Sequence, residues 1–90
     1  MKLEWDELKR QATLELRGLD FADASLVFDS VELELEDDRK DYGEVRLITF
    51  GFIEQRPVAM VWTLRGKNRR IISMRHVHDD EIEARKRALD

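Results

Sequence analysis

Residues 58–77 read VAMVWTLRGKNRRIISMRHV, and this stretch decides the fold. It begins with a strongly apolar run, Val58 to Leu64, and continues after a short turn at 66–68 with a second run, Arg69 to Val77. Glycine and asparagine between two strand-like runs are typical of a tight hairpin turn. The stretch therefore predicts two antiparallel strands.

The segments before this hairpin also favour strands. In residues 31–36, valine and leucine alternate with glutamate, which is the period of a strand with one face in water. A charged turn at 37–41 follows, then a strand predicted from Tyr42 to Ile53 and a connection at 55–57. Four strands with such short connections predict an antiparallel sheet.

Helices are predicted at both ends of the chain. Apolar residues spaced by three and four indicate a first helix, capped by Asp6 or Glu4 and ended by Gly18; they are Trp5, Leu8, Ala12 and Leu16. A second helix is predicted from Phe21 to Phe28 with Asp20 as its N-cap, and a third from Asp79 to Leu89. The sequence thus predicts an α+β fold: two N-terminal helices, a four-stranded antiparallel sheet covered by helices on one face, and a C-terminal helix.

Length and composition restrict the classes of protein that fit this sequence. Ninety residues suffice for one domain with a single hydrophobic core. The chain has no cysteine, which excludes disulfides and thiolate metal sites and agrees with a reducing compartment. Its first residues are charged, and no run approaches the roughly 20 apolar residues that a membrane helix needs. We therefore expect a soluble cytoplasmic protein that makes no membrane contact.

Charge is distributed unevenly along the chain. The net charge of −4 by itself argues against a nucleic-acid-binding protein. Residues 42–76, however, carry 7 basic and 2 acidic side chains, whereas residues 1–41 carry 6 basic and 13 acidic ones. An anion-binding face on the sheet is therefore compatible with an acidic chain. The alternative is that strand arginines pair with the acids of helices and turns.

Two short segments contain charged residues within the predicted strands: Tyr42-Gly43-Glu44-Val45-Arg46 and Arg70-Ile71-Ile72-Ser73-Met74-Arg75. Strand alternation puts Glu44 and Arg46 on one side of their strand. It also puts Arg69, Ser73 and Arg75 together on one side of the last strand. The sequence does not decide which side is open. A glutamate and an arginine at this spacing form a cross-strand ion pair more often than an active site.

The amino-acid sequence resembles the BrnT family of type II toxins over nearly its whole length. No single element of the resemblance is specific, but the ordered set at these spacings is. The matching residues are Trp5-Asp6, Lys9, Gly18, Phe21, Ala24, Phe28, Asp38-Arg39, Tyr42-Gly43-Glu44, Arg46, Gly51, Arg70-Ile71-Ile72-Ser73, Arg75 and Glu81.

The resemblance implies a RelE-like toxin domain over residues 1–90 and a ribonuclease that needs no cofactor. It also implies a BrnA-type antitoxin as partner, through which the toxin contacts operator DNA. A metal-free ribonuclease needs a base for the 2′-hydroxyl proton, cations that stabilise the phosphate in the transition state, and an acid for the leaving oxygen. Arginine suits the second task because its planar fork holds phosphate oxygens bidentately.

The resemblance also implies roles for individual residues. Arg46 and Arg75 are expected to neutralise the scissile phosphate, and Glu44 to act as base or to orient Arg46. His76 stands where the family has a basic residue and can transfer protons near neutral pH. The residues expected to contact RNA are Lys9, Arg69, Arg70 and Ser73.

The chain departs from the family in its first helix. It has Thr13 and Arg17-Gly18 where the family usually has asparagine and then histidine-glycine. These departures favour a second hypothesis, a non-catalytic module that keeps the toxin fold and acts with its antitoxin in operon repression. Retention of the arginines favours the enzyme.

Two further expectations concern surface groups. The glutamates of the alternating strand are expected to bind basic residues of the antitoxin; they are Glu32, Glu34 and Glu36. His76 and His78 lack a third suitably spaced ligand, so we expect no metal site. Trp5 and Trp62 lie on apolar stripes and are expected in the core.

Overall fold

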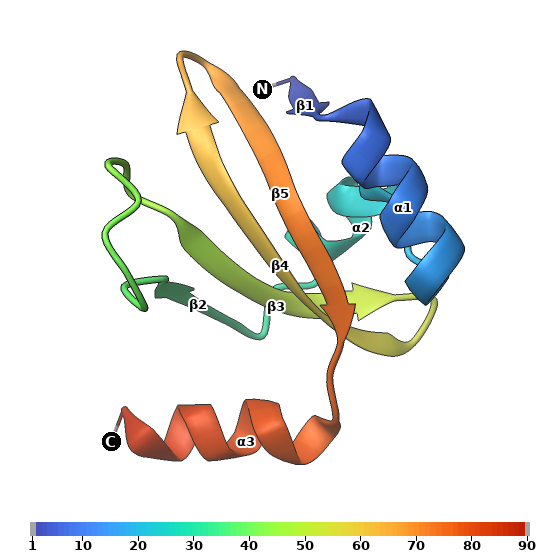
Figure 1. Ribbon diagram of the computed structural model, residues 1–90. Helices are drawn as coiled ribbons and strands as arrows, with labels where there is room; N and C mark the ends of the chain where they lie inside the picture. Colours follow the sequence, from blue (N-terminus) through green and yellow to red (C-terminus); the bar gives the residue numbers. More distant parts are fainter. Residues whose placement is uncertain (1, 90) are drawn as a thin grey trace.

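A five-stranded mixed sheet forms the centre of the protein in the computed structural model, which describes residues 2–89 (Figure 1). The strands lie in the order β1-β5-β4-β3-β2. The elements are β1 (Leu3–Trp5), α1 (Glu7–Arg17), the 3-10 helix η1 (Phe21–Asp23), α2 (Ala24–Phe28), β2 (Leu33–Glu36), β3 (Leu47–Ile53), β4 (Arg56–Arg65), β5 (Asn68–His76) and α3 (Asp79–Ala88).

The hairpin predicted from residues 58–77 is confirmed as β4 and β5. Its register changes once: Val61 pairs with Ser73, but Trp62 pairs with Ile71, so Ile72 is an extra residue in β5. Such a β-bulge interrupts the alternation of side chains. Ile72 and Ser73 consequently lie on the same face of the sheet. The alternation of side chains before Ile72 therefore does not continue through Ser73 and the residues after it.

The prediction of four antiparallel strands is wrong by one strand. Leu3–Trp5 pairs with β5 in parallel, and Glu4 is in register with Arg70. The sequence pattern had assigned Trp5 to the first helix. Asp6 separates the two elements because its carboxylate accepts hydrogen bonds from the backbone of Leu8 and Lys9 and caps α1.

The segment with Glu44 and Arg46 was also predicted as part of a strand that starts at Tyr42. This prediction is wrong, because β3 begins only at Leu47. Local side-chain contacts hold the segment before it in turns: Asp41 Oδ1 accepts from the Gly43 N–H at 2.8 Å, and Gly43 has a φ of 70°. Such contacts compete with the ladder of a sheet. Residues 37–46 therefore form a loop.

Helices cover both faces of the sheet, which corrects the prediction of one covered face. On the first face, residues of η1 and α2 form the main core with strand residues such as Met60, Trp62 and Met74. On the second face, Ile82 of α3 packs with a smaller apolar cluster that includes Phe50 and Val61. Figure 1 shows α3 near one end of the sheet, away from α1 and α2.

Gly51 allows α2 to lie close to β3. A Cβ at this position would stand 2.7 Å from the Val27 carbonyl oxygen and 3.0 Å from Ser30 Oγ. Both contacts are shorter than van der Waals distance, and the first is with backbone, which cannot rotate away. Glycine at residue 51 therefore fixes how closely the helix layer packs on the sheet.

Candidate functional site

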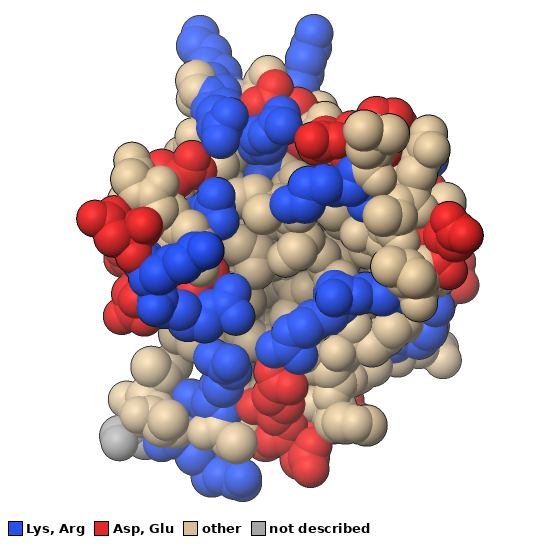
Figure 2. Space-filling model, in the orientation of Figure 1, with Lys and Arg blue, Asp and Glu red and all other residues tan. Residues whose placement is uncertain are grey.

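A cleft opens on the second face of the sheet, the face that α1 and α2 do not cover. Its volume is about 230 Å³. The eight residues that line it are Arg17, Arg39, Ile48, Ala59, Val61, Ser73, Arg75 and Arg85. Figure 2 shows this face as a hollow of uncharged residues surrounded by Lys and Arg side chains. We call this hollow the arginine cleft.

The arginines of the cleft come from four separate segments. Arg75 lies in β5, where the bulge at Ile72 places both it and Ser73 on the cleft face. Arg17 is the last residue of α1, and its guanidinium donates to the Met74 carbonyl oxygen at 2.6 Å. Arg39 comes from the 37–46 loop and Arg85 from α3. Only the tertiary fold brings these residues together.

Asp37 holds Arg39 in a bidentate pair. Arg39 Nε donates to Asp37 Oδ1 at 2.7 Å, and Arg39 Nη2 donates to Oδ2 at 2.9 Å. The hydrogen bonds from the Arg39 guanidinium lower the pKa of the Asp37 carboxyl to about 2, against the opposing effect of burial. The aspartate is therefore ionised at neutral pH, and the guanidinium is fixed in one orientation.

Glu81 holds the arginines at the α3 side. Its carboxylate accepts from Arg75 Nη1 at 3.2 Å and Nη2 at 2.7 Å, and it lies 3.7 Å from Arg85 Nε. The hydrogen bonds from Arg75 lower the pKa of the Glu81 carboxyl. The four guanidinium groups and these two carboxylates leave an excess of two positive charges at the cleft.

This arrangement is chemically suited to an anion with apolar parts. Guanidinium groups bind phosphate oxygens by paired, charge-assisted hydrogen bonds. The floor between them is apolar and consists of Ile48, Ala59 and Val61. Bases of single-stranded nucleic acid stack on aromatic rings and on guanidinium planes, and the cleft offers guanidinium groups for such contacts.

Glu44 and Arg46 lie in the 37–46 loop and do not line the arginine cleft. The Arg46 guanidinium carbon stands 4.0 Å from the centre of the Tyr42 ring, and Arg46 Nε lies 3.7 Å from Glu44 Oε2. Glu44 also pairs with Arg65 at 3.1 Å. Desolvation raises the pKa of the Glu44 carboxyl, but Arg65, Arg46 and Thr63 outweigh this effect and the pKa is lowered. A carboxylate with a lowered pKa is a weaker base.

The structure distributes the other predicted RNA contacts over several surfaces. Ser73 lines the arginine cleft with Arg75. Arg69 lies on the first face, 3.9 Å from the centre of the Phe28 ring and 5.2 Å from that of Trp62. The prediction that Arg69 shares a face with Ser73 is wrong, because the bulge between them shifts the alternation. Arg70 is half-buried in β5, and Lys9 is exposed on α1.

His76 lies at the end of β5 beside the end of α1. Its Nε2 stands 2.8 Å from the Arg17 carbonyl oxygen. A carbonyl oxygen only accepts, so this hydrogen bond assigns the hydrogen to Nε2. His76 thus touches the backbone of one cleft residue and follows another, Arg75, in sequence.

The three glutamates of the alternating segment do not share one environment. Glu32 pairs with Lys86 of α3 at 2.9 Å, and Glu34 accepts from Thr49 Oγ1 at 2.6 Å. Glu36 is exposed at the end of β2. Their common role as an antitoxin contact stays a prediction.

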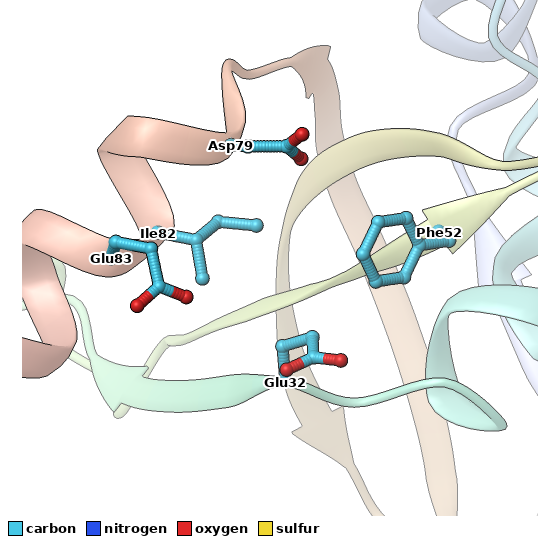
Figure 3. A pocket seen from close by; sticks show the side chains of 5 residues that line it. All are labelled: Glu32, Phe52, Asp79, Ile82 and Glu83. Carbon is cyan, nitrogen blue, oxygen red and sulfur yellow. The ribbon is translucent and has the colours of Figure 1, made fainter.

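A second pocket, between α3 and the sheet, has the opposite charge (Figure 3). Its lining residues are Glu32, Phe52, Asp79, Ile82 and Glu83. Three carboxylates around a pocket repel phosphate. Of the two pockets beside α3, only the arginine cleft therefore suits a nucleic acid.

Reasoning from the sequence missed Arg17, Arg39 and Arg85 as members of the site. Arg17 had a signal, because it stands at the helix end where the family has another basic residue. Arg39 also had a signal, because the Asp38-Arg39 pair is one of the motifs that carry the family resemblance. Arg85 had no such signal, since α3 carries many charged residues. Only the packing of Ile82 on the sheet decides which charged side chain of α3 reaches the cleft.

Within residues 2–89, no group of three or more histidine and acidic side chains is arranged to hold a metal ion. No helix in the same range is long and apolar enough to cross a membrane.

Comparison with known proteins identifies the family. The model of a family described as the ribonuclease toxin BrnT of type II toxin–antitoxin systems matches residues 5–81. A comparison with curated proteins gave no match. The matched segment includes Arg17, Arg39 and Arg75 of the cleft and ends at Glu81, whereas Arg85 lies beyond it. The chain therefore belongs to the BrnT family, the ribonuclease toxins of type II toxin–antitoxin systems.

Proposed function

We propose that this protein cleaves RNA in the arginine cleft without a metal, by attack of a 2′-hydroxyl on the adjacent phosphate. The observation that carries the proposal is the convergence of four guanidinium groups, from four segments, on one cleft in the second face of the sheet. Bringing like charges together is unfavourable without an anion, so the arrangement suits a phosphodiester.

In this mechanism the arginines stabilise the transition state. Negative charge builds up on the oxygens of the five-coordinate phosphate, and preoriented cations at hydrogen-bond distance lower its energy. Arg75 and Arg39 serve this role because Glu81 and Asp37 already orient their forks. Ser73 contributes a hydroxyl that can donate to a phosphate oxygen from the floor of the same cleft.

Proton transfer has two candidates, and neither of them lines the cleft. His76 follows Arg75 in β5, so strand alternation directs its side chain to the face opposite the cleft. There Nε2 donates to the Arg17 carbonyl oxygen, and Nδ1 has no hydrogen bond among the described residues. His76 is the first candidate for the base, since a neutral imidazole that donates from Nε2 can accept a proton at Nδ1. Glu44 and Arg46 form the second candidate pair, at the rim of the 37–46 loop.

One observation favours binding without cleavage. Of the eight described residues that line the cleft, none is a histidine or a carboxylate, which are the usual proton acceptors. The second candidate function is therefore an RNA-binding or antitoxin-binding module with the toxin fold, active in operon repression.

Expression of the protein alone, followed by purification and incubation with RNA, separates the two functions. We expect growth arrest and RNA cleavage by the wild-type protein, and a loss of roughly 100-fold or more in cleavage rate for Arg75→Ala, because one preoriented donor is removed. Co-expression of a BrnA-type antitoxin should prevent the arrest.

The matched control is Arg56→Ala, which removes the same charge from an exposed arginine in the β3–β4 hairpin. It should cleave RNA like the wild type. Harmless expression of folded wild-type protein that binds but does not cut RNA would support the non-catalytic module instead.

A further inference from the structure

Asp37 is the one ionisable residue that is buried among residues 2–89, with 4% of its surface exposed. Burial of a carboxylate is unfavourable unless its oxygens are paired. Asp37 accepts four hydrogen bonds: two from the Arg39 guanidinium, one from the Arg39 backbone N–H at 3.3 Å and one from the Tyr42 hydroxyl at 3.1 Å. The aspartate is therefore a fully satisfied anchor at the start of the 37–46 loop.

The Arg39 side chain, which Asp37 holds, is itself exposed to solvent. Arg39 has 66% of its side chain exposed and lines the arginine cleft. A guanidinium has five N–H groups, and Asp37 engages two of them. Three remain for an anion, on a fork whose plane the buried carboxylate fixes.

Tyr42 connects the same anchor to two more cations. Its hydroxyl donates to Asp37 Oδ2, and its ring lies under the guanidinium of Arg46 at 4.0 Å and the ammonium of Lys40 at 5.2 Å. Cations over an aromatic face are attracted to it. The cationic side of the loop therefore depends on the placement of Asp37.

We propose that Asp37 is a positioning residue for RNA binding: it holds the Arg39 fork at the wall of the arginine cleft so that the fork engages a backbone phosphate. The proposal rests on the function proposed above. For the removal of the Asp37 carboxylate, a positioning role and electrostatics alone predict opposite changes in RNA affinity. Removal of a carboxylate from a phosphate-binding surface should strengthen RNA binding by electrostatics, whereas loss of a positioning residue weakens it.

The experiment measures binding of a single-stranded RNA oligonucleotide whose sugars are all 2′-O-methylated, so that it cannot be cut. Asp37→Asn is compared with Asp38→Asn, which removes the same charge from the exposed neighbour. We expect Asp37→Asn to bind about tenfold more weakly than the wild type and Asp38→Asn to bind at least as tightly. The slope of log K against log salt should become less negative by about 0.7 in Asp37→Asn, the value of one single-strand phosphate contact.

Arg39 variants distinguish positioning from a general loss of structure. Arg39→Ala should reproduce the Asp37→Asn defect, and the double variant should bind as Arg39→Ala does, because both changes remove the same contact. A structural role would instead make the two losses multiply. If Asp37→Asn does not fold, Arg39→Lys decides, since a lysine keeps the charge but cannot form the bidentate pair: binding like Arg39→Ala supports positioning, and binding like the wild type overturns it.

The outcomes also separate this inference from the proposed function. A wild-type protein that does not bind the oligonucleotide overturns the proposed function itself. Wild-type binding with unchanged or tighter binding by Asp37→Asn overturns only the positioning role.

Discussion

Asp37 and Glu81 show how two carboxylates of the same site differ in their surroundings. The Asp37 side chain is 1% exposed, whereas that of Glu81 is 32% exposed and shares its contacts between Arg75 and Arg85. Solvent screens an exposed pair and weakens it, while a buried pair must keep its partner. The Asp37 carboxylate therefore depends more on its hydrogen-bond partners than that of Glu81 does, although the Arg39 side chain is exposed.

The lowered pKa of Asp37 makes the stability of the protein depend on pH. Its folded pKa is about 2, below the ordinary value of 3.8, so the ionised carboxylate stabilises the folded state. This stabilisation is fully present above a pH of about 4 and is lost as the pH falls through about 2. We expect the difference in unfolding free energy between wild type and Asp37→Asn to shrink over that interval.

Urea unfolding at several pH values between 6 and 2 checks this expectation. Asp38→Asn serves as the control, because Asp38 is exposed. A difference between wild type and Asp37→Asn that stays constant over the whole interval would contradict the assignment.

At the scale of elements, α1 differs most from what its sequence pattern predicts. The apolar stripe indicated a helix packed into the core, yet none of the described α1 residues is buried. Leu8 is 78% and Leu16 is 82% exposed. Polar contacts connect the helix to the rest of the molecule instead: Arg10 pairs with Asp20, and Arg17 donates to the Met74 carbonyl oxygen. The Asp6 cap and the Glu7–Arg10 pair stabilise the helix itself.

Two substitutions to alanine test this view of α1. Leu16→Ala should change the free energy of unfolding by about 0.5 kcal/mol or less, because the side chain is already in water. Met74→Ala, its matched control in the core, should cost about 2–5 kcal/mol, because Met74 is 0% exposed and leaves a cavity. Chemical unfolding of both variants as isolated protein provides the measurement. Comparable losses would mean that α1 packs more deeply than described.

The bulge in β5 changes which side chains share a face of the sheet. It keeps Met74 in the main core while Ser73 and Arg75 face the cleft, and it leaves Arg69 on the opposite face. Strict alternation would have placed Arg69 beside Ser73. One extra residue therefore decides which arginines belong to the site.

At the scale of the whole molecule, an acidic protein carries a cationic cleft. The net charge is −4, but the four arginines of the cleft gather on one face (Figure 2). The acidic pocket of Figure 3 lies between α3 and the sheet, beside Glu32 and Phe52. Charge of opposite sign on different parts of one surface steers a polyanion toward a single site.

RNA binding should therefore depend strongly on salt in spite of the negative net charge. If four phosphates contact the four arginines, the slope of log K against log salt is about −3, from roughly 0.7 for each single-strand contact. Titration of the 2′-O-methylated oligonucleotide at several salt concentrations measures this slope. Arg56→Ala should keep the wild-type slope and Arg85→Ala should reduce it. A slope near zero would contradict phosphate binding at the cleft.

The sequence by itself determined the elements that local patterns control. It determined the β4–β5 hairpin from its turn residues, α1 from its apolar spacing and Gly18 end, and the family from the order of its motifs. These features depend on neighbours in the chain, where spacing and side-chain chemistry are sufficient. Ser73 and Arg75 were therefore also recognised as site candidates.

Only the tertiary structure decided the composition of the site. The short β1 forms because β5 offers a free edge, residues 37–46 form a loop because Asp41 and Asp37 bind nearby groups, and the bulge resets the faces of β5. Arg17, Arg39 and Arg85 meet Arg75 through packing between segments that lie far apart in the sequence. Periodicity describes which way a side chain points on its own element, and it contains no information about which elements will meet.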